Sequence, residues 1–155
     1  MEIKNLISQT EYDIYTAVCQ QTNLFLFHQP DTIFNDHTAD EQFHIINNTP
    51  RFGGAFKYKV VRRKGLIEDY EVKNARQWTL EKRFYFKNGY CFVSELTHQQ
   101  TDKPCGVFTL SRVGLSASLD DALVHIAYSI CGYYLLFHLN GSNWEQVGYL
   151  MSYCV

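Results

Sequence analysis

The stretch KRFYFKNGYCFVSE, residues 82–95, alternates aromatic and polar side chains around the central pair Asn88-Gly89. Both central residues of a type I′ turn need positive φ, which this pair tolerates, so the stretch predicts a β-hairpin. The turn fixes the register and sets Phe84 opposite Val93. Because aromatic side chains fall on both faces of this hairpin, we expect another element or a ligand to cover each face.

The alternation continues on both sides of the hairpin. From Phe56 onward the period is two, so Phe56 and Tyr58 share one face while lysines share the other. The same period recurs around residues 70–72, and residues 107–113 supply a further strand. We therefore predict an antiparallel meander of about five strands between residues 56 and 113.

Helical signals flank this meander. Residues 118–121, Ser-Leu-Asp-Asp, resemble a helix start, and the apolar residues after them predict a core helix over 118–131. Residues 4–20 carry apolar residues near helical spacing and predict an amphipathic N-terminal helix. Alternatively, the strand formers in 12–19 pair with residues 24–27 as a hairpin.

Two shorter patterns complete the chain. Thr38-Ala-Asp-Glu41 has the capping-box pattern, which predicts a short helix carrying Phe43. Near the C-terminus, residues 133–139 and 147–153 predict a closing hairpin joined by residues 140–146.

These elements define an α+β fold, in which a twisted antiparallel β-meander is packed by a helix in the C-terminal half and by N-terminal helical segments. We treat residues 1–155 as one globular domain, because this length fits a single core and neither a linker nor a repeat interrupts it. A small closed antiparallel β-barrel, lipocalin-like in architecture, is the alternative if residues 12–27 form a hairpin.

The composition is that of a globular chain. Hydrophobic residues make up 46% and aromatic residues 15% of the sequence, which excludes a disordered chain and favours a sheet-rich core. The N-terminus has no basic segment that leads into an apolar run, so we expect no secretory signal. Residues 122–139 lack formal charge but include histidines and tyrosines, and we interpret them as core helix and strand instead of a membrane span.

The five cysteines are odd in number and contain no C-x-x-C pair, so we expect neither a disulfide framework nor a zinc site. This usage favours a reducing, cytoplasmic location. Cys19, Cys91 and Cys131 lie in apolar patterns and are interpreted as small core residues. Cys105 lies in a predicted loop without a recognisable base, and we interpret it as a bystander thiol.

Charge is segregated along a chain whose formal net charge is −2. Residues 1–50 carry one basic and seven acidic residues, 51–90 carry eleven basic and four acidic, and 91–155 carry two basic and five acidic. Such asymmetry indicates a partner of complementary charge. The predicted binding residues are the cations and rings of the basic sheet: Lys57, Lys59, Arg63, Arg83, Tyr85, Lys87, Tyr90 and Phe92.

The sequence contains no P-loop, dinucleotide-binding glycine pattern or nucleophile elbow, so we assign no catalytic residue and no cofactor. His37, Glu41 and His44 have i, i+4, i+7 spacing, which would align them as metal ligands on one helix face. The cap predicted at Thr38 leaves His37 outside that helix. We therefore favour a solvated acidic helix and assign no metal.

We expect a non-catalytic binding protein of the inhibitor or adaptor type, whose protein partner docks on the basic aromatic sheet or on the acidic residues 31–41. The alternative is a ligand-binding domain or small enzyme whose pocket, for an anionic or apolar ligand, is lined by Phe84, Phe86, Trp78 and Phe108. Binding of single-stranded nucleic acid is a lesser alternative, because the chain is acidic and lacks an RNP-like segment.

Overall fold

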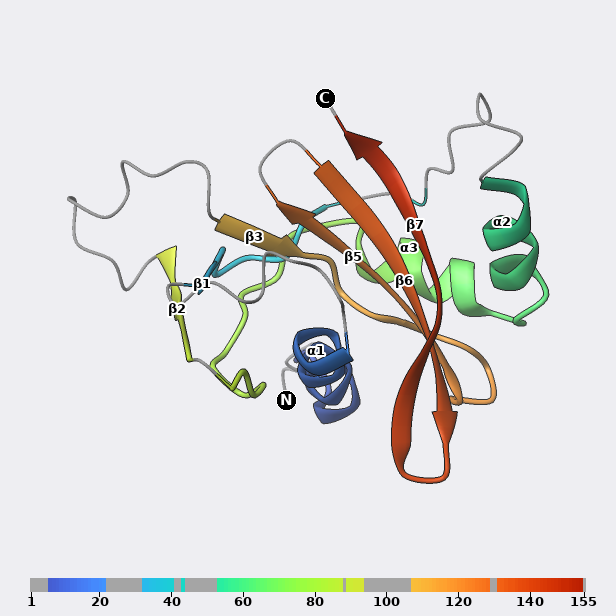
Figure 1. Ribbon diagram of the computed structural model, residues 1–155, viewed down its shortest axis with the longest axis horizontal. Coiled ribbons are helices and arrows are strands. Elements are labelled where there is room, and N and C mark those ends of the chain that lie inside the picture. Colours follow the sequence, from blue (N-terminus) through green and yellow to red (C-terminus); the bar gives the residue numbers. More distant parts are fainter. Residues whose placement is uncertain are drawn as a thin grey trace, which may run out of the picture.

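An open, mixed β-sheet runs through the computed structural model and carries helices on both faces (Figure 1). The structure describes residues 6–21, 32–40, 43, 53–87, 89–93, 107–128 and 131–154. Within these residues, seven strands join in the order β2-β1-β3-β5-β6-β7, with β4 paired to β5. The α+β class is confirmed, whereas this open sheet does not support the barrel alternative.

Helix α1 (Gln9–Gln21) covers one face of the sheet, and its apolar side contributes Ile14 and Val18 to the larger core cluster. The predicted N-terminal helix is therefore confirmed, and the alternative hairpin over 12–19 is wrong. The sequence Ser8-Gln-Thr-Glu11 starts the helix as a capping box: the Glu11 N–H donates to the Ser8 hydroxyl at 3.2 Å, and the Ser8 N–H donates to the Glu11 carboxylate at 2.8 Å.

The opposite face is covered by α2 (Gly53–Val61) and α3 (Leu66–Lys73). The strands predicted around residues 56 and 70 are therefore wrong. Phe56 and Val60 are at positions i and i+4, so one face of the helix buries both. The same spacing also places two residues on one face of a strand, because side chains at even intervals share a face there. Among the described residues, no helix is long and apolar enough to span a membrane.

The C-terminal part of the sheet is an antiparallel meander of β5 (Asp121–Tyr128), β6 (Cys131–Asn140) and β7 (Asn143–Cys154). Strands β6 and β7 confirm the predicted closing hairpin, with longer strands and a shorter connection than expected. The connection is a two-residue turn in which Gly141 has a φ of 64°, a left-handed conformation that suits glycine.

The helix predicted over residues 118–131 is wrong, because this segment contains strand β5. Val124 contributes to the core beneath α1, whereas Leu123 contributes to the core beneath α2 and α3. A strand buried on both faces needs apolar residues at almost every position, so its sequence has no alternation. Periodicity alone does not separate such a strand from a buried helix.

The other end of the sheet contains four short strands: β1 (Thr32–Phe34), β2 (Tyr90–Phe92), β3 (Val107–Leu110) and β4 (Gly114–Leu115). β1 pairs in parallel with both β2 and β3, and β3 pairs antiparallel with β5. The strand predicted from residue 107 is confirmed in its first four residues.

The hairpin predicted over residues 82–95 is wrong. Strand β2 pairs with β1 in parallel, and the residues before the turn are not in a strand. Gly89 does have the positive φ of a turn, 74°, while Asn88 lies outside the described residues. Phe84 is buried because its ring packs against α1 and stacks on the ring of Tyr90 at 4.4 Å, which satisfies the aromatic pattern without a strand pair.

Thr38 does not start a helix within the described residues. Its hydroxyl accepts a hydrogen bond from the Trp78 N–H at 2.9 Å, and its own N–H donates to the Trp78 carbonyl at 2.8 Å. Of the predicted short helix, Glu41 and the residues after Phe43 lie outside the described residues.

Cys131 is disulfide-bonded, which the sequence interpretation did not anticipate. The strand register sets its backbone opposite that of Cys154. The cysteines are therefore not all free thiols, and cysteine usage no longer favours a reducing compartment. Cys19 is a buried free thiol as predicted, whereas Cys91 is exposed. Cys105 lies outside the described residues.

Candidate functional site

A polar cavity of about 290 Å³ lies where the turn between α2 and α3 meets the turn that leads into β5. One turn contributes basic side chains, and the other contributes hydroxyls and carboxylates. An imidazole from β6 completes the wall. We call this the polar cavity; it is lined by Arg62, Arg63, Lys64, Ser116, Ser118, Asp120, Asp121 and His138.

Backbone hydrogen bonds hold the two turns together. The Ala117 N–H donates to the Lys64 carbonyl at 2.9 Å, which connects the acidic turn to the basic one. Gly65 has a φ of 80°, so the chain reverses between the two helices at a residue without a Cβ. The acidic turn is closed by Ser116, whose N–H donates to the Asp121 carbonyl at 3.0 Å and whose hydroxyl accepts from the Asp121 N–H at 3.1 Å.

Asp121 links the basic turn to β6. Its Oδ1 atom accepts a hydrogen bond from Arg63 Nε at 2.7 Å and lies 2.8 Å from His138 Nδ1. The strand register explains the second contact, because Asp121 on β5 lies directly opposite His138 on β6. Arg63 is further fixed by a hydrogen bond of 2.5 Å from its Nη1 to the Lys59 carbonyl. The cavity is therefore organised before any ligand enters.

Asp120 supplies the second carboxylate. Its Oδ1 atom accepts hydrogen bonds from the hydroxyls of Ser118 and Ser116, the latter at 3.2 Å. The hydrogen bond from Ser118 is the main reason that the pKa of the Asp120 carboxyl is below its ordinary value. Asp120 is therefore ionised at neutral pH and acts only as a hydrogen-bond acceptor.

Asp120, Asp121 and His138 each offer one ligand atom, and these atoms lie within 4.8 Å of one another. This oxygen and nitrogen set is chemically suited to a first-row divalent metal. However, the Arg63 guanidinium already contacts Asp121, and Arg62 and Lys64 add further positive charge at the cavity wall. The surrounding charge therefore disfavours a cation and favours a ligand with an anionic group.

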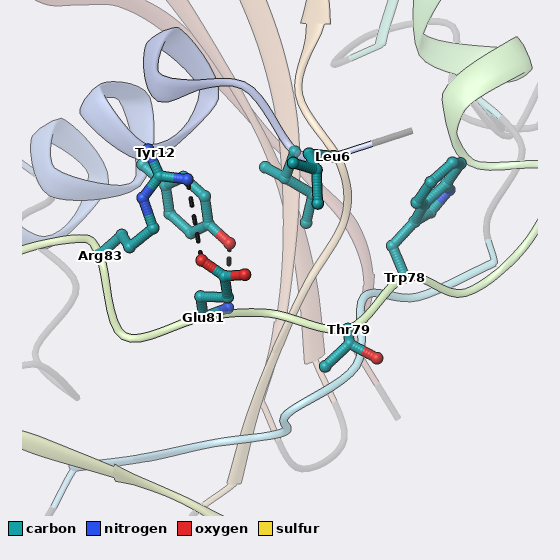
Figure 2. Close-up of a pocket in the computed structure, with 7 residues that line it drawn as sticks. Leu6, Tyr12, Trp78, Thr79, Glu81 and Arg83 are labelled. Atoms are coloured by element: carbon teal, nitrogen blue, oxygen red, sulfur yellow. Dashed lines mark hydrogen bonds and ion pairs between the residues drawn. The ribbon is translucent and has the colours of Figure 1, made fainter. Parts of the chain in front are cut away.

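A second pocket, of about 240 Å³, lies between the N-terminal end of α1 and the segment after α3 (Figure 2). Leu6, Tyr12 and Trp78 give it apolar walls, and Glu81 and Arg83 are its charged groups. The Arg83 guanidinium lies 4.9 Å from the Tyr12 ring centroid and 3.7 Å from the Glu81 carboxylate. These charged groups contact one another, so this pocket offers a ligand less polar complementarity than the polar cavity does.

The structure does not bring the predicted binding residues together. Lys57 and Lys59 are exposed on α2, and Arg63 lines the polar cavity. Arg83, Tyr85 and Lys87 lie in the segment between α3 and β2. Tyr90 and Phe92 are 8% and 4% exposed, so the prediction that their rings are available to a partner is wrong.

The pocket predicted from Phe84, Phe86, Trp78 and Phe108 is also wrong in its main part. The three phenylalanines are packed in the core beneath α1, and only Trp78 lines a described pocket. Of the metal candidates, His37 contacts Asp36 at 2.5 Å, while Glu41 and His44 lie outside the described residues.

Sequence reasoning missed the acidic wall of the polar cavity. Ser118, Asp120 and Asp121 were interpreted as the start of a helix, because hydroxyls and carboxylates also cap helices. Residues 116–120 form the turn between β4 and β5 instead, and Asp121 is the first residue of β5. If residues 121–128 are interpreted as a strand, helix capping no longer explains Ser118, Asp120 and Asp121, and this is the signal that the sequence offered.

Comparison with known proteins identifies no relative: no family model matches the chain, and no similar curated protein or solved structure was found.

Proposed function

We propose that this protein binds a small anionic ligand in the polar cavity. The observation that carries the proposal is the convergence of Arg62, Arg63 and Lys64 on one cavity wall, together with hydrogen-bonding groups on the other. This arrangement agrees with the basic character of residues 51–90, although these three cations lie in the turn after α2 and not on a sheet.

The two exposed cations carry most of the proposed anion affinity. Arg63 already uses two of its nitrogen atoms, for Asp121 and the Lys59 carbonyl. Arg62 and Lys64 are exposed at the cavity rim. An arginine presents five N–H donors in a planar fork that matches carboxylate and phosphate oxygens, and a lysine adds a compact point charge.

Binding, and not catalysis, is the activity that the geometry favours. The serine hydroxyls nearest to the carboxylates donate to Asp120, and His138 Nδ1 contacts Asp121. Among the described residues that line the cavity, no hydroxyl or thiol is hydrogen-bonded to His138 as a nucleophile would be to its base. A pre-organised set of charged and hydrogen-bonding side chains of this kind suits the recognition of a small anion.

Isothermal titration calorimetry with inorganic phosphate, pyrophosphate and citrate at low ionic strength tests this proposal, because screening by salt weakens exposed charges. The wild type is compared with the double variant Arg62→Glu/Lys64→Glu. The matched control is Lys57→Glu/Lys87→Glu, which makes the same change in net charge at exposed lysines that do not line the cavity.

We expect the wild type and the control to bind at least one of the three anions with the same affinity, and the cavity variant to bind it at least about tenfold more weakly. Equal weakening in the cavity variant and the control would show that the anion senses only net charge, and equal affinities in all three proteins would show that it does not contact these cations. Either result, or no binding by the wild type, would overturn the proposal.

A further inference from the structure

The polar cavity contains two carboxylates close to its three cations, and a simple anion site does not explain them. Burying or crowding an aspartate beside an anionic ligand costs free energy unless the aspartate accepts hydrogen bonds from that ligand. The ligand that suits this cavity therefore has an anionic end and hydrogen-bond donors on the same small molecule.

Both carboxylates retain acceptor capacity. An ionised carboxylate has two oxygens and about four acceptor positions. The hydrogen bonds from Arg63 and His138 converge on Oδ1 of Asp121, and those from Ser116 and Ser118 converge on Oδ1 of Asp120. The Oδ2 atom of each aspartate is thus the natural acceptor for a donor on the ligand.

Hydroxyl groups suit these acceptors better than an ammonium group does. The carboxylate of Asp121 already has the Arg63 guanidinium at 2.7 Å, and Arg62 and Lys64 line the same cavity. A further cation placed among these groups would be repelled, whereas a neutral hydroxyl donates to a carboxylate without adding charge. The cavity is open to solvent, and its volume of about 290 Å³, at the lower end of ligand pockets, suits a small ligand.

From these observations we infer that the ligand is a phosphorylated sugar or polyol, with its phosphate held by Arg62 and Lys64 and its hydroxyls held by Asp120 and Asp121. This inference rests on the proposed function, since it names the class of anion that the cavity selects. Hydroxyl recognition by a charged acceptor gives specificity, because a ligand without the hydroxyl leaves the carboxylate unpaired.

The test is calorimetric titration of the full chain with phosphate monoesters that differ in hydroxyl content. Glycerol 3-phosphate, ribose 5-phosphate and glucose 6-phosphate carry hydroxyls, whereas ethyl phosphate has the same charged group without them. The variant Asp120→Asn keeps an oxygen that can accept from Ser116 and Ser118 but loses the charge of the acceptor. A thermal melt checks that this variant is folded.

We expect at least one of the three hydroxylated esters to bind the wild type at least about tenfold more tightly than ethyl phosphate does, and Asp120→Asn to lose most of that difference. If ethyl phosphate binds as tightly as all three, the inference is wrong while the proposed anion site stands. If no ester binds but one of the three simple anions does, the inference is wrong and the proposed function stands, and if none of these anions binds, both fail. The comparison of ligands on the wild type decides the inference even if the variant does not fold.

Discussion

A buried ion pair between Glu11 and Arg112 offers the sharpest test of how α1 is held to the sheet. Glu11 is fully buried and Arg112 is 7% exposed. Arg112 Nε donates to Oε1 of Glu11 at 3.0 Å, and Nη2 donates to Oε2 at 2.9 Å. The same carboxylate completes the capping box with Ser8, so a single side chain both starts α1 and connects it to the segment after β3.

We predict that Arg112→Met destabilises the protein by about 3–5 kcal/mol, because it leaves the buried Glu11 carboxylate without its charged partner. Native proteins have a total stability of about 5–15 kcal/mol, so this loss would be a large share of it. Glu11→Gln retains the acceptor for Ser8 but removes the charge opposite Arg112. The double variant leaves no unpaired buried charge, and we expect it to lose less stability than the two single changes together.

Urea denaturation of the four proteins, measured by far-UV circular dichroism, gives the free energies of unfolding and the coupling. We expect the double variant to be more stable than the sum of the single losses by at least about 1.5 kcal/mol. If Arg112→Met costs less than about 1 kcal/mol, or if the losses simply add, the ion pair does not hold α1 as the structure indicates.

The same ion pair predicts a dependence of stability on pH. Burial alone would raise the pKa of Glu11, but the hydrogen bond from Arg112 and the charge of Lys73 outweigh it, so the pKa is below its ordinary value of 4.5. A lowered pKa stabilises the fold above the ordinary value, and this contribution is lost as the pH falls through the pKa of the folded state. Glu11→Gln should therefore lose less stability than the wild type below about pH 4.5, and parallel losses would contradict this.

Two further predictions concern packing and thiol chemistry. A Cβ at Gly114 would lie 2.6 Å from the Cβ of Tyr70, whereas a Cβ at Gly148 would make only ordinary contacts of 3.5 Å or more. Gly114→Ala should therefore lower the free energy of unfolding, measured in urea, by about 1–3 kcal/mol more than Gly148→Ala does. Equal effects of the two substitutions would contradict the close approach of α3 to β4. Burial raises the pKa of the Cys19 thiol to about 12, so iodoacetamide at pH 8 should modify the exposed Cys91 in the native protein and leave Cys19 unmodified until urea unfolds the chain. Early labelling of Cys19, detected by mass spectrometry, would show that α1 does not pack Cys19 into the core.

The sequence predicted the elements near the two ends of the chain best. The apolar spacing of residues 9–21 favours a helix that buries one side over the alternative hairpin, and the segments around Gly141 favour a hairpin. The prediction failed where two interpretations share the same residues. Phe56 and Val60 fit one face of a strand and one face of a helix equally, and strand β5 is apolar on both faces.

The polar cavity was beyond sequence reasoning for a spatial reason. Its basic turn at residues 62–65 and its acidic turn at 116–121 are about 50 residues apart, and His138 comes from a third segment. Only the packing of α2 and α3 on the sheet, and the register that sets Asp121 opposite His138, bring these groups together. The excess of basic residues in 51–90 was visible, but its place on a helix and a turn was not.

An NMR titration of the ¹⁵N-labelled wild type with phosphate monoesters tests whether the polar cavity binds a small anion. We predict that the amide signals which move first and furthest belong to residues 62–65, 116–121 and 138, because these line or support the cavity. Signals that move only around Tyr12, Trp78 and Arg83 would place binding in the second pocket instead. That result, or a spectrum that does not change, would contradict the account.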